Sequence, residues 1–462
     1  MNIEKSVEVL SKDLVESTRQ IIRINSVESS PKENMPFGEN VQKALDFALN
    51  LSRDMGFKVV NLDNYVGYAE YGEGEDYIAV LGHLDVVPEG DGWNSGPYSG
   101  DLIDGTIYGR GAVDDKGPII AALYGLKAIK DSGVKLSKRV RIIFGTNEET
   151  GCNDIPYYLE REKPPIMGFT PDADFPVIHG EKGLLIFDIV KDVLDEQTSP
   201  VKVVYIKGGT RENMVPDYCE AEILSEDKEE IIKIYKFLKS NNNINIKIEE
   251  TDLGFIIKTY GVSAHGSCPF LGKNAIMGMI NFLSKLNVNG SVGEFIKFME
   301  EKIGFNLHGE GLDINLIDSV SGPLTMNVGI IDVKKNICSV SLDVRHPVTF
   351  KLDDVMKPLK VLLAKVNIRV QNQTYSTPLY FEKEHPLVKS LQEVYTSVTG
   401  EDIEPITIGG GTYAKEMPNT LAFGPMFPHR DDVAHKPNEH IKVEDLIMCC
   451  KIYAAAIESL AK

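Results

Sequence analysis

The segment YIAVLGHLDV, residues 77–86, is an almost unbroken apolar run that ends in a histidine and an aspartate. Such runs are typical of strands that are buried on both faces of a parallel sheet. Similar strands are expected at residues 57–62 (FKVVNL) and 139–146 (RVRIIFGT), and a helix that ends at Gly133 is expected before the last of them. The alternation of strands and helices predicts an α/β domain with a largely parallel sheet.

The pattern changes after about residue 185, where polar and apolar residues alternate as they do in strands with one buried face. Helical stretches interrupt these strands, and the α/β pattern returns towards the C-terminal end. We therefore predict one α/β domain, residues 1–185 and 381–462, that is interrupted by an α+β domain, residues 186–380. The Asn-rich stretch SNNNINI, residues 240–246, is typical of a turn.

Composition and charge restrict the kinds of partner. The 462 residues include 49 Lys and Arg against 68 Asp and Glu, and the net charge of −19 disfavours binding to nucleic acid or to anionic lipid surfaces. No stretch approaches the roughly 20 apolar residues of a membrane span, and the N-terminal segment lacks the apolar core of a signal peptide. The six cysteines form no CxxC pair, which fits a reducing compartment. We therefore expect a soluble cytoplasmic protein.

Acidic residues and one histidine stand at the ends of the predicted strands and helix. His83 and Asp85 are two residues apart at a strand end, so their side chains project to the same face. His83 could hold a metal while Asp85 orients its ring. Taken alone, the two residues are more simply explained as a structural pair. Asp114 and Asp115 precede a helix, where an acidic N-cap is the simpler explanation.

Glu148 and Glu149 follow the strand at residues 139–146, and two neighbouring carboxylates could divide the work of metal ligand and general base. A charged turn is the alternative for this pair, and Asp172 is one of several acids in its loop. Together, however, these groups recur at the C-terminal ends of successive strands, where open α/β sheets bind ligands. One histidine, several carboxylates and a further histidine from the late segment suit two divalent transition ions, most simply zinc or manganese, with one bridging carboxylate.

Four segments carry a family resemblance: GHLDVVPEGDGW, YGRGAVDDKGP, GTNEETG and FTPDADFPVIHGEKG. In this order they resemble the metal-site segments of dinuclear metallopeptidases of the aminoacylase and carboxypeptidase type. The whole chain is most similar to the bacterial carnosine-type dipeptidases of that family, over nearly all 462 residues. The resemblance implies a two-domain metallopeptidase, in which the α+β domain is a lid that interrupts the catalytic α/β domain.

The resemblance also implies which residues would hold the metals. One ion would be held by His83 and Asp172, and the other by Glu149 and His435. Asp114 would bridge the two ions, as expected of a dinuclear site.

Other residues are assigned by the same resemblance. Glu148 would be the general base, Asp85 would orient the histidine beside it, and the peptide bond that precedes Asp115 would be cis. The late histidine is taken from the segment AHKPNE. His429, in a loop, and His440, at the start of a predicted helix, would be structural.

The lid would complete the site. His265 would stabilise the oxyanion, Asn213 would position the substrate, and Arg345 would clasp its C-terminal carboxylate through two hydrogen bonds. Gly410 and Gly411 would let the backbone approach that carboxylate. Taken singly, each of the three lid side chains is better explained by a turn or a surface position.

The implied activity is hydrolysis of the peptide bond of unblocked dipeptides by a metal-activated water, with Glu148 as the base. Zinc is the expected metal, with manganese or cobalt as alternatives. An N-acyl amino acid deacylase or desuccinylase would use the same dinuclear core, and a peptide-binding protein without turnover is a third interpretation. The long lid resembles those that complete the site within one chain, so a monomer could function alone, and a homodimer stays open.

Overall fold

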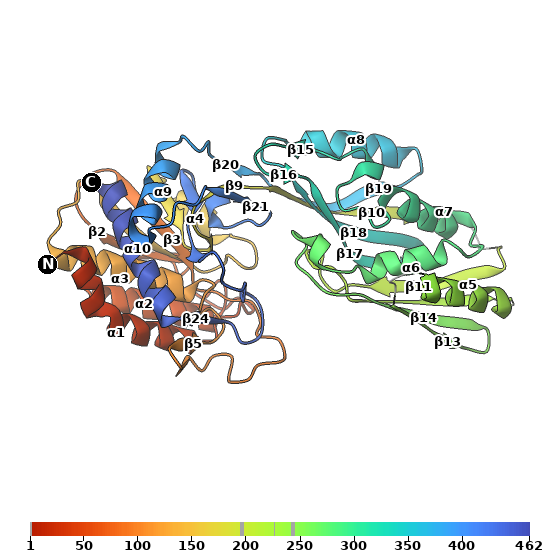
Figure 1. Cartoon of the computed structure of the whole chain (residues 1–462), viewed down its shortest axis with the longest axis horizontal. Coiled ribbons are helices and arrows are strands. Elements are labelled where there is room, and N and C mark those ends of the chain that lie inside the picture. Colours follow the sequence, from red (N-terminus) through yellow and green to blue (C-terminus); the bar gives the residue numbers. More distant parts are fainter. Residues whose placement is uncertain (1, 195–197, 226, 242–244) are drawn as a thin grey trace. The chain divides into compact units, whose positions relative to one another are not determined.

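The chain folds into two compact units (Figure 1). The computed structural model describes residues 2–194, 198–225, 227–241 and 245–462. Unit 1 contains Met1–Gly180, Phe381–Thr407 and Gly411–Lys462. Unit 2 contains Glu181–Tyr380 and Ile408–Gly410.

The boundaries of the units differ slightly from the predicted domain limits. The chain passes from unit 1 to unit 2 after Gly180 and returns to unit 1 after Tyr380, whereas the predicted domain limits were residues 185 and 380. Ile408–Gly410 join unit 2, which the sequence did not indicate. The Asn-rich turn predicted at residues 240–246 lies partly outside the described residues.

Unit 1 is built on a mixed sheet with a parallel centre. Across the sheet the strands follow in the order β1 (Lys58–Leu62), β2 (Val66–Tyr71), β6 (Arg139–Gly145), β3 (Tyr77–His83), β7 (Met167–Thr170), β22 (Thr420–Ala422) and β9 (Ile178–Glu181). β3 pairs in parallel with both β6 and β7, and β22 pairs in parallel with β7. β1 and β2, like β2 and β6, are antiparallel. The predicted α/β class is confirmed, with the parallel pairing confined to the centre of the sheet.

Helices cover both faces of this sheet (Figure 1). On one face Ile78 and Val80 of β3 enter a large apolar core. The helices that supply this core are α1 (Ile3–Ile22), α2 (Glu39–Asp54), α3 (Lys116–Ser132), α9 (Pro386–Thr399) and α10 (Val443–Ala461). On the other face Leu81 packs with Tyr158 of α4 (Asp154–Leu159) and with Tyr413. Alternate residues of β3 thus enter different cores, as expected for a strand that is buried on both faces.

Unit 2 is an antiparallel sheet with helices on one face. Across the sheet the strands follow in the order β13 (Asn245–Glu250), β14 (Gly254–Tyr260), β12 (Tyr218–Ser225), β11 (Val201–Gly208), β17 (Thr325–Lys334), β18 (Ile337–His346), β10 (Gly183–Asp192) and β19 (Arg369–Ser376). Alternate residues of β10, such as Leu185 and Phe187, pack in one apolar core with the helices. These helices are α5 (Lys228–Asn241), α6 (Ala275–Leu283), α7 (Gly290–Phe298) and α8 (Leu352–Ala364). The alternation seen in the sequence therefore marks strands with one buried face.

Two expectations about the surroundings of the protein can be compared with the structure. Among the described residues, no helix combines the length and the apolar character that crossing a membrane requires. All six cysteines are free thiols.

A buried carboxylate links three strands of unit 1 at the edge that lies away from the parallel centre. Glu70 on β2 accepts hydrogen bonds from Lys58 (2.9 Å), Arg139 (2.8 Å) and Arg141 (2.7 Å), which lie on the two neighbouring strands. Burial raises the pKa of Glu70, but the hydrogen bonds from Lys58 and Arg141 outweigh burial and leave this pKa below its usual value. The network therefore stabilises the sheet only while Glu70 is ionised.

We predict that Glu70→Gln lowers the free energy of unfolding at pH 7 by about 3 kcal/mol, because it removes the negative charge that pairs with buried Arg141 and replaces one acceptor oxygen by an NH₂ group. A carboxylate whose pKa is depressed in the folded state stabilises fully above its unfolded pKa of about 4.3, and that stabilisation is lost as the pH falls through the folded pKa. Scanning calorimetry should therefore show a large difference in melting temperature between wild type and variant at pH 7 and a smaller one at pH 3.5. An equal difference at both pH values would contradict the role of Glu70, and the exposed Glu73→Gln is the control.

Candidate metal centre

The candidate ligands gather at the C-terminal ends of the parallel strands of unit 1. His83 is the last residue of β3, Glu148 and Glu149 follow β6, and Asp172 follows β7. Asp114 comes just before α3, and its peptide bond to the next residue is cis, as the resemblance implied. Because neighbouring parallel strands end at the same edge of the sheet, residues far apart in the sequence meet there.

Asp114 lies between two histidines. Its Oδ1 is 3.0 Å from Nε2 of His83, and its Oδ2 is 2.9 Å from Nε2 of His435. Asp172 Oδ2 lies 3.7 Å from the His83 nitrogen, and Glu149 Oε2 lies 3.2 Å from the His435 nitrogen. The structure therefore brings the five predicted ligands together, one histidine and one carboxylate on each side of Asp114.

Several of these side chains are close enough to share a cation. Ligand atoms of His83, Asp114 and Glu149 all lie within 4.8 Å of one another, and so do those of His83, Glu148 and Asp172. The Glu148 carboxylate therefore lies within the same cluster as the candidate metal ligands. Imidazole nitrogens combined with carboxylate oxygens form a donor set that suits zinc and manganese.

The ring of His83 is buried and is oriented by the chain that follows it. Its Nδ1 lies 3.0 Å from the backbone oxygen of Asp85 and 3.6 Å from the carboxylate of the same residue. Because a carbonyl oxygen only accepts, Nδ1 carries a proton, and Nε2 is the nitrogen that faces Asp114. The Asp85 carboxylate accepts the backbone N–H groups of Glu148 (3.2 Å) and Glu149 (3.1 Å). Asp85 therefore orients His83 mainly through its backbone, while its side chain fixes the turn that carries both glutamates.

Asp115 binds the backbone at the end of β3. Its side chain is buried, and Oδ2 accepts the backbone N–H of His83 at 3.1 Å. A Cβ atom on Gly82 would lie 2.2 Å from this oxygen, so the close approach requires glycine. Asp115 thereby ties the start of α3 to the strand that ends in His83.

A buried ion pair supports the backbone of Asp114. The Glu439 carboxylate accepts the backbone N–H groups of Val113 (3.0 Å) and Asp114 (3.3 Å) and a hydrogen bond from Arg110 (2.7 Å). Sequence reasoning assigned no role to this pair. The available signal was that Arg110 and Glu439 belong to YGRGAVDDKGP and AHKPNE, the same motifs that contain ligands.

Four carboxylates in one cluster make ionisation costly. Burial, together with the charge of Asp114, raises the pKa of Asp172 to about 6, and burial also raises the pKa of Glu148 and of Glu149. Burial lowers the pKa of His435, but its hydrogen bonds to Asp114 and Glu149 prevail and raise this pKa to about 11. Oε1 of Glu149 is buried and has no hydrogen-bond partner in the described part of the chain. Divalent cations would bind that oxygen and offset the crowded negative charge, so these residues fit such ions.

The two other late histidines have different surroundings. His440 begins β24 (His440–Lys442), and its Nδ1 lies 2.9 Å from the backbone oxygen of Asn438. The predicted helix start at His440 is wrong, since α10 begins at Val443. His429 lies in a loop with φ of 70°. The structural role expected for both histidines stays a prediction.

In unit 2 the segments that carry the three candidate side chains lie against one another. The backbone oxygen of Asn213 accepts the N–H of Gly266, the residue after His265, at 2.7 Å. A Cβ atom on Gly266 would lie 2.8 Å from this oxygen and 2.7 Å from Oδ2 of Asp343. Asp343 in turn accepts hydrogen bonds from Arg345. Asn213, His265 and Arg345 are therefore carried by segments that contact one another directly or through Asp343.

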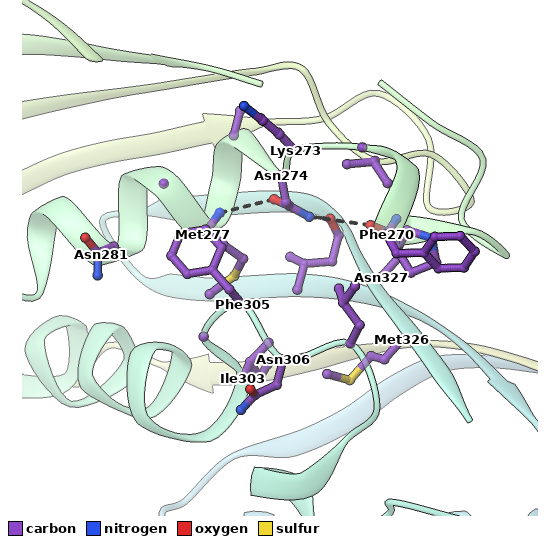
Figure 2. Close-up of a pocket in the computed structure, with 18 of the residues that line it drawn as sticks. Phe270, Lys273, Asn274, Met277, Asn281, Ile303, Phe305, Asn306, Met326 and Asn327 are labelled. Atoms are coloured by element: carbon purple, nitrogen blue, oxygen red, sulfur yellow. Dashed lines mark hydrogen bonds between the residues drawn. The ribbon is translucent and has the colours of Figure 1, made fainter. Parts of the chain in front are cut away.

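Asn274 anchors the start of α6 to the sheet of unit 2 (Figure 2). The Asn274 side chain accepts the backbone N–H of Met277 at 3.1 Å and donates to the backbone oxygen of Val328 on β17 at 2.8 Å. These groups border a cavity of about 630 Å³ within unit 2. One amide thus caps α6 and attaches the loop before it to the sheet.

Gly410 and Gly411 lie on either side of the limit between the units. Neither has a positive φ, so the conformational freedom of glycine is not what these positions use. The backbone oxygen of Gly409, just before them, accepts a hydrogen bond from Arg345 at 2.9 Å. The expected approach of this backbone to a substrate carboxylate stays a prediction.

Comparison with known proteins extends over the whole chain. A model of peptidase family M20/M25/M40 matches residues 79–459. A Bacillus subtilis protein named "Putative dipeptidase YtjP" is 39% identical over 466 residues, which cover 100% of each chain. A Staphylococcus epidermidis protein named "Putative dipeptidase" is 36% identical over 456 residues, which cover 97% of each chain.

Solved structures share the fold at low sequence identity. Human carnosine dipeptidase 1 matches with a TM-score of 0.62 and 17% identity, over 99% of this chain and 98% of that chain. The di-peptidase Dug1p from Saccharomyces cerevisiae matches with a TM-score of 0.59 and 14% identity, over 99% of this chain and 98% of that chain. The resemblance found in the sequence is thus confirmed, and the chain belongs to peptidase family M20/M25/M40.

Proposed function

We propose that this protein is a metal-dependent dipeptidase that hydrolyses the peptide bond of unblocked dipeptides. The observation that carries the proposal is the position of Asp114, whose two oxygens face two different histidines at 3.0 and 2.9 Å. A carboxylate in this position suits a pair of divalent ions. Family membership and the names of the two bacterial relatives support a peptidase that acts on dipeptides.

The proposed ligands divide into two sets that share Asp114. His83 and Asp172 would hold one ion, and Glu149 and His435 the other. When bound, two such ions supply Lewis acidity, which lowers the pKa of water and polarises the scissile carbonyl. Zinc is the first candidate, and manganese and cobalt are the alternatives.

Glu148 is proposed as the general base. It is the one carboxylate of the cluster that is left over when the five ligands are assigned, and the hydrogen bond from its backbone N–H to Asp85 fixes its position. Its carboxylate would accept a proton from water as the water oxygen adds to the carbonyl carbon, and would then return that proton to the leaving nitrogen. Burial and the charge of Asp172 raise the pKa of Glu148 above its usual range, which suits a carboxylate that takes up a proton and returns it.

Residues of unit 2 are proposed to bind the substrate. His265 would donate a hydrogen bond to the oxyanion, Asn213 would position the substrate, and Arg345 would bind the carboxylate at its C-terminal end. Gly410 and Gly411 would approach the same carboxylate. The proposal also includes a cytoplasmic location, which the free cysteines support.

A panel of substrates tests the activity itself. The purified protein should be assayed with zinc, manganese and cobalt in turn on unblocked dipeptides, including β-Ala-His, and on analogues blocked at either end. We expect the unblocked dipeptides to be hydrolysed with a much higher kcat/KM than the analogues blocked at either end. Preference for N-acetyl or N-succinyl amino acids would indicate a deacylase or desuccinylase, and no hydrolysis with any metal would indicate a peptide-binding protein.

We predict that Glu148→Gln keeps two metal ions but lowers kcat at least about a hundredfold, since a general base contributes this much or more. Elemental analysis and steady-state kinetics on a cleaved dipeptide measure the two effects separately. Glu160→Gln, at an exposed carboxylate of the same unit, should leave both unchanged. Turnover retained in Glu148→Gln would exclude Glu148 as the base.

We predict that His435→Ala lowers the metal content, because it removes a nitrogen that lies within 3.2 Å of two carboxylates of the cluster. His429→Ala and His440→Ala should bind as much metal as the wild type. Elemental analysis after dialysis against each metal measures the content. Full occupancy in His435→Ala, with loss in one of the other two variants, would transfer the ligand role to that histidine.

A further inference from the structure

Arg345 is held between a carboxylate and a backbone carbonyl of unit 2. Its Nε donates to Oδ1 of Asp343 at 2.7 Å, and its Nη2 donates to Oδ2 at 2.8 Å. Its Nη1 donates to the backbone oxygen of Gly409 at 2.9 Å. Both side chains are buried, with 3% of Arg345 and 0% of Asp343 exposed. Residues 343 and 345 are two apart on β18, so one strand presents the complete ion pair on one face.

The three bonds leave a defined remainder of the guanidinium group. Arginine has five N–H groups, and these contacts use one on each of its three nitrogens. One N–H therefore remains on Nη1 and one on the neighbouring Nη2. Two N–H groups on adjacent nitrogens of a planar fork match the two oxygens of a carboxylate.

Asp343 also contacts the segments that carry the other two candidates. Its Oδ2 lies against Gly266, next to His265, where a Cβ atom would be 2.7 Å away. Its partner across the strand pair is Asn327, whose amide donates to the backbone oxygens on either side of Asn213, at 3.2 and 2.8 Å. The plane of the guanidinium is thereby fixed relative to both of these segments.

We propose that Asp343 is a positioning residue for substrate recognition. It fixes the plane of Arg345 so that the two remaining N–H groups bind the C-terminal carboxylate of the dipeptide. It also compensates the charge of Arg345, so the site selects a carboxylate by the geometry of two hydrogen bonds more than by net charge. This inference rests on the proposed dipeptidase function and on the role of Arg345 in it.

Asp343→Asn changes the hydrogen bonds to Arg345 without changing the size of the side chain. Asparagine keeps the shape and one acceptor oxygen for Nε–H, but its NH₂ group faces the N–H of Nη2, so the guanidinium turns away. For an unblocked dipeptide we expect KM to rise about tenfold, as for the loss of one charge-assisted hydrogen bond, with kcat changed less than about twofold. For the matching dipeptide with a C-terminal amide we expect KM to change less than about twofold. Its amide has one acceptor oxygen and cannot accept hydrogen bonds from both N–H groups.

The readout is therefore the ratio of kcat/KM between the free and the amidated dipeptide. Asp343→Asn should lower this ratio about tenfold, and Arg345→Lys should lower it as well. In the double variant the ratio should fall little further than in the more affected single variant, as expected for residues that act as one unit. Asp332→Asn, the same change at an acid of the neighbouring strand β17, should leave the ratio unchanged.

Folding and function are kept apart by two further measurements. Melting temperatures by circular dichroism show whether each variant folds, and Asp343→Glu, which keeps the charge but displaces the fork, serves if Asp343→Asn does not fold. Asp343→Glu should lower the ratio by a smaller factor. A folded Asp343 variant with an unchanged ratio, or with equal losses on both substrates, overturns the positioning role while the wild-type turnover still supports the dipeptidase. No wild-type turnover of either substrate overturns both.

Discussion

The crowding of four carboxylates at one edge of the unit 1 sheet is the constraint on which the site depends. Burial and mutual repulsion raise the pKa of Glu148, Glu149 and Asp172 in this partly buried cluster. Burial opposes ionisation of Asp114 as well, but its two histidine partners prevail and hold the pKa of Asp114 below its usual value. Side chains alone would separate to reduce that repulsion. They stay together because the strands that carry them are fixed by apolar cores on both faces of the sheet. The free energy of those cores therefore offsets the electrostatic cost until cations bind.

A second group of acids makes that arrangement rigid. Asp85, Asp115 and Glu439 are buried, and each accepts backbone N–H groups from a segment that carries a ligand. Through these hydrogen bonds each carboxylate fixes the position of a neighbouring loop or strand end. The two groups of acids differ in what their oxygens face: backbone N–H groups for the supporting acids, and histidines or one another for the ligand cluster.

The sequence predicted the fold well where the signal is local. Apolar runs and their alternation with helices indicate the buried strands, and the ends of parallel strands must meet, so the meeting of His83, Glu148 and Asp172 followed from their places in the pattern. Antiparallel pairing of β2 with β6 and the role of Glu439 depend on contacts between distant residues, which no periodicity records. His440 was misplaced because a strand of three residues is too short to show a period. No role was predicted for Asp343, although its spacing of two residues from Arg345 on one strand places both side chains on the same face.

The two units treat charge in opposite ways. Unit 1 concentrates four carboxylates beside two histidines, so its site attracts cations. Unit 2 offers a guanidinium whose charge is already compensated by Asp343. An uncompensated guanidinium would attract any anion, including the many carboxylates of a chain with a net charge of −19. A compensated one binds a carboxylate only where two oxygens match two N–H groups, so selectivity comes from the arrangement of donors on one strand.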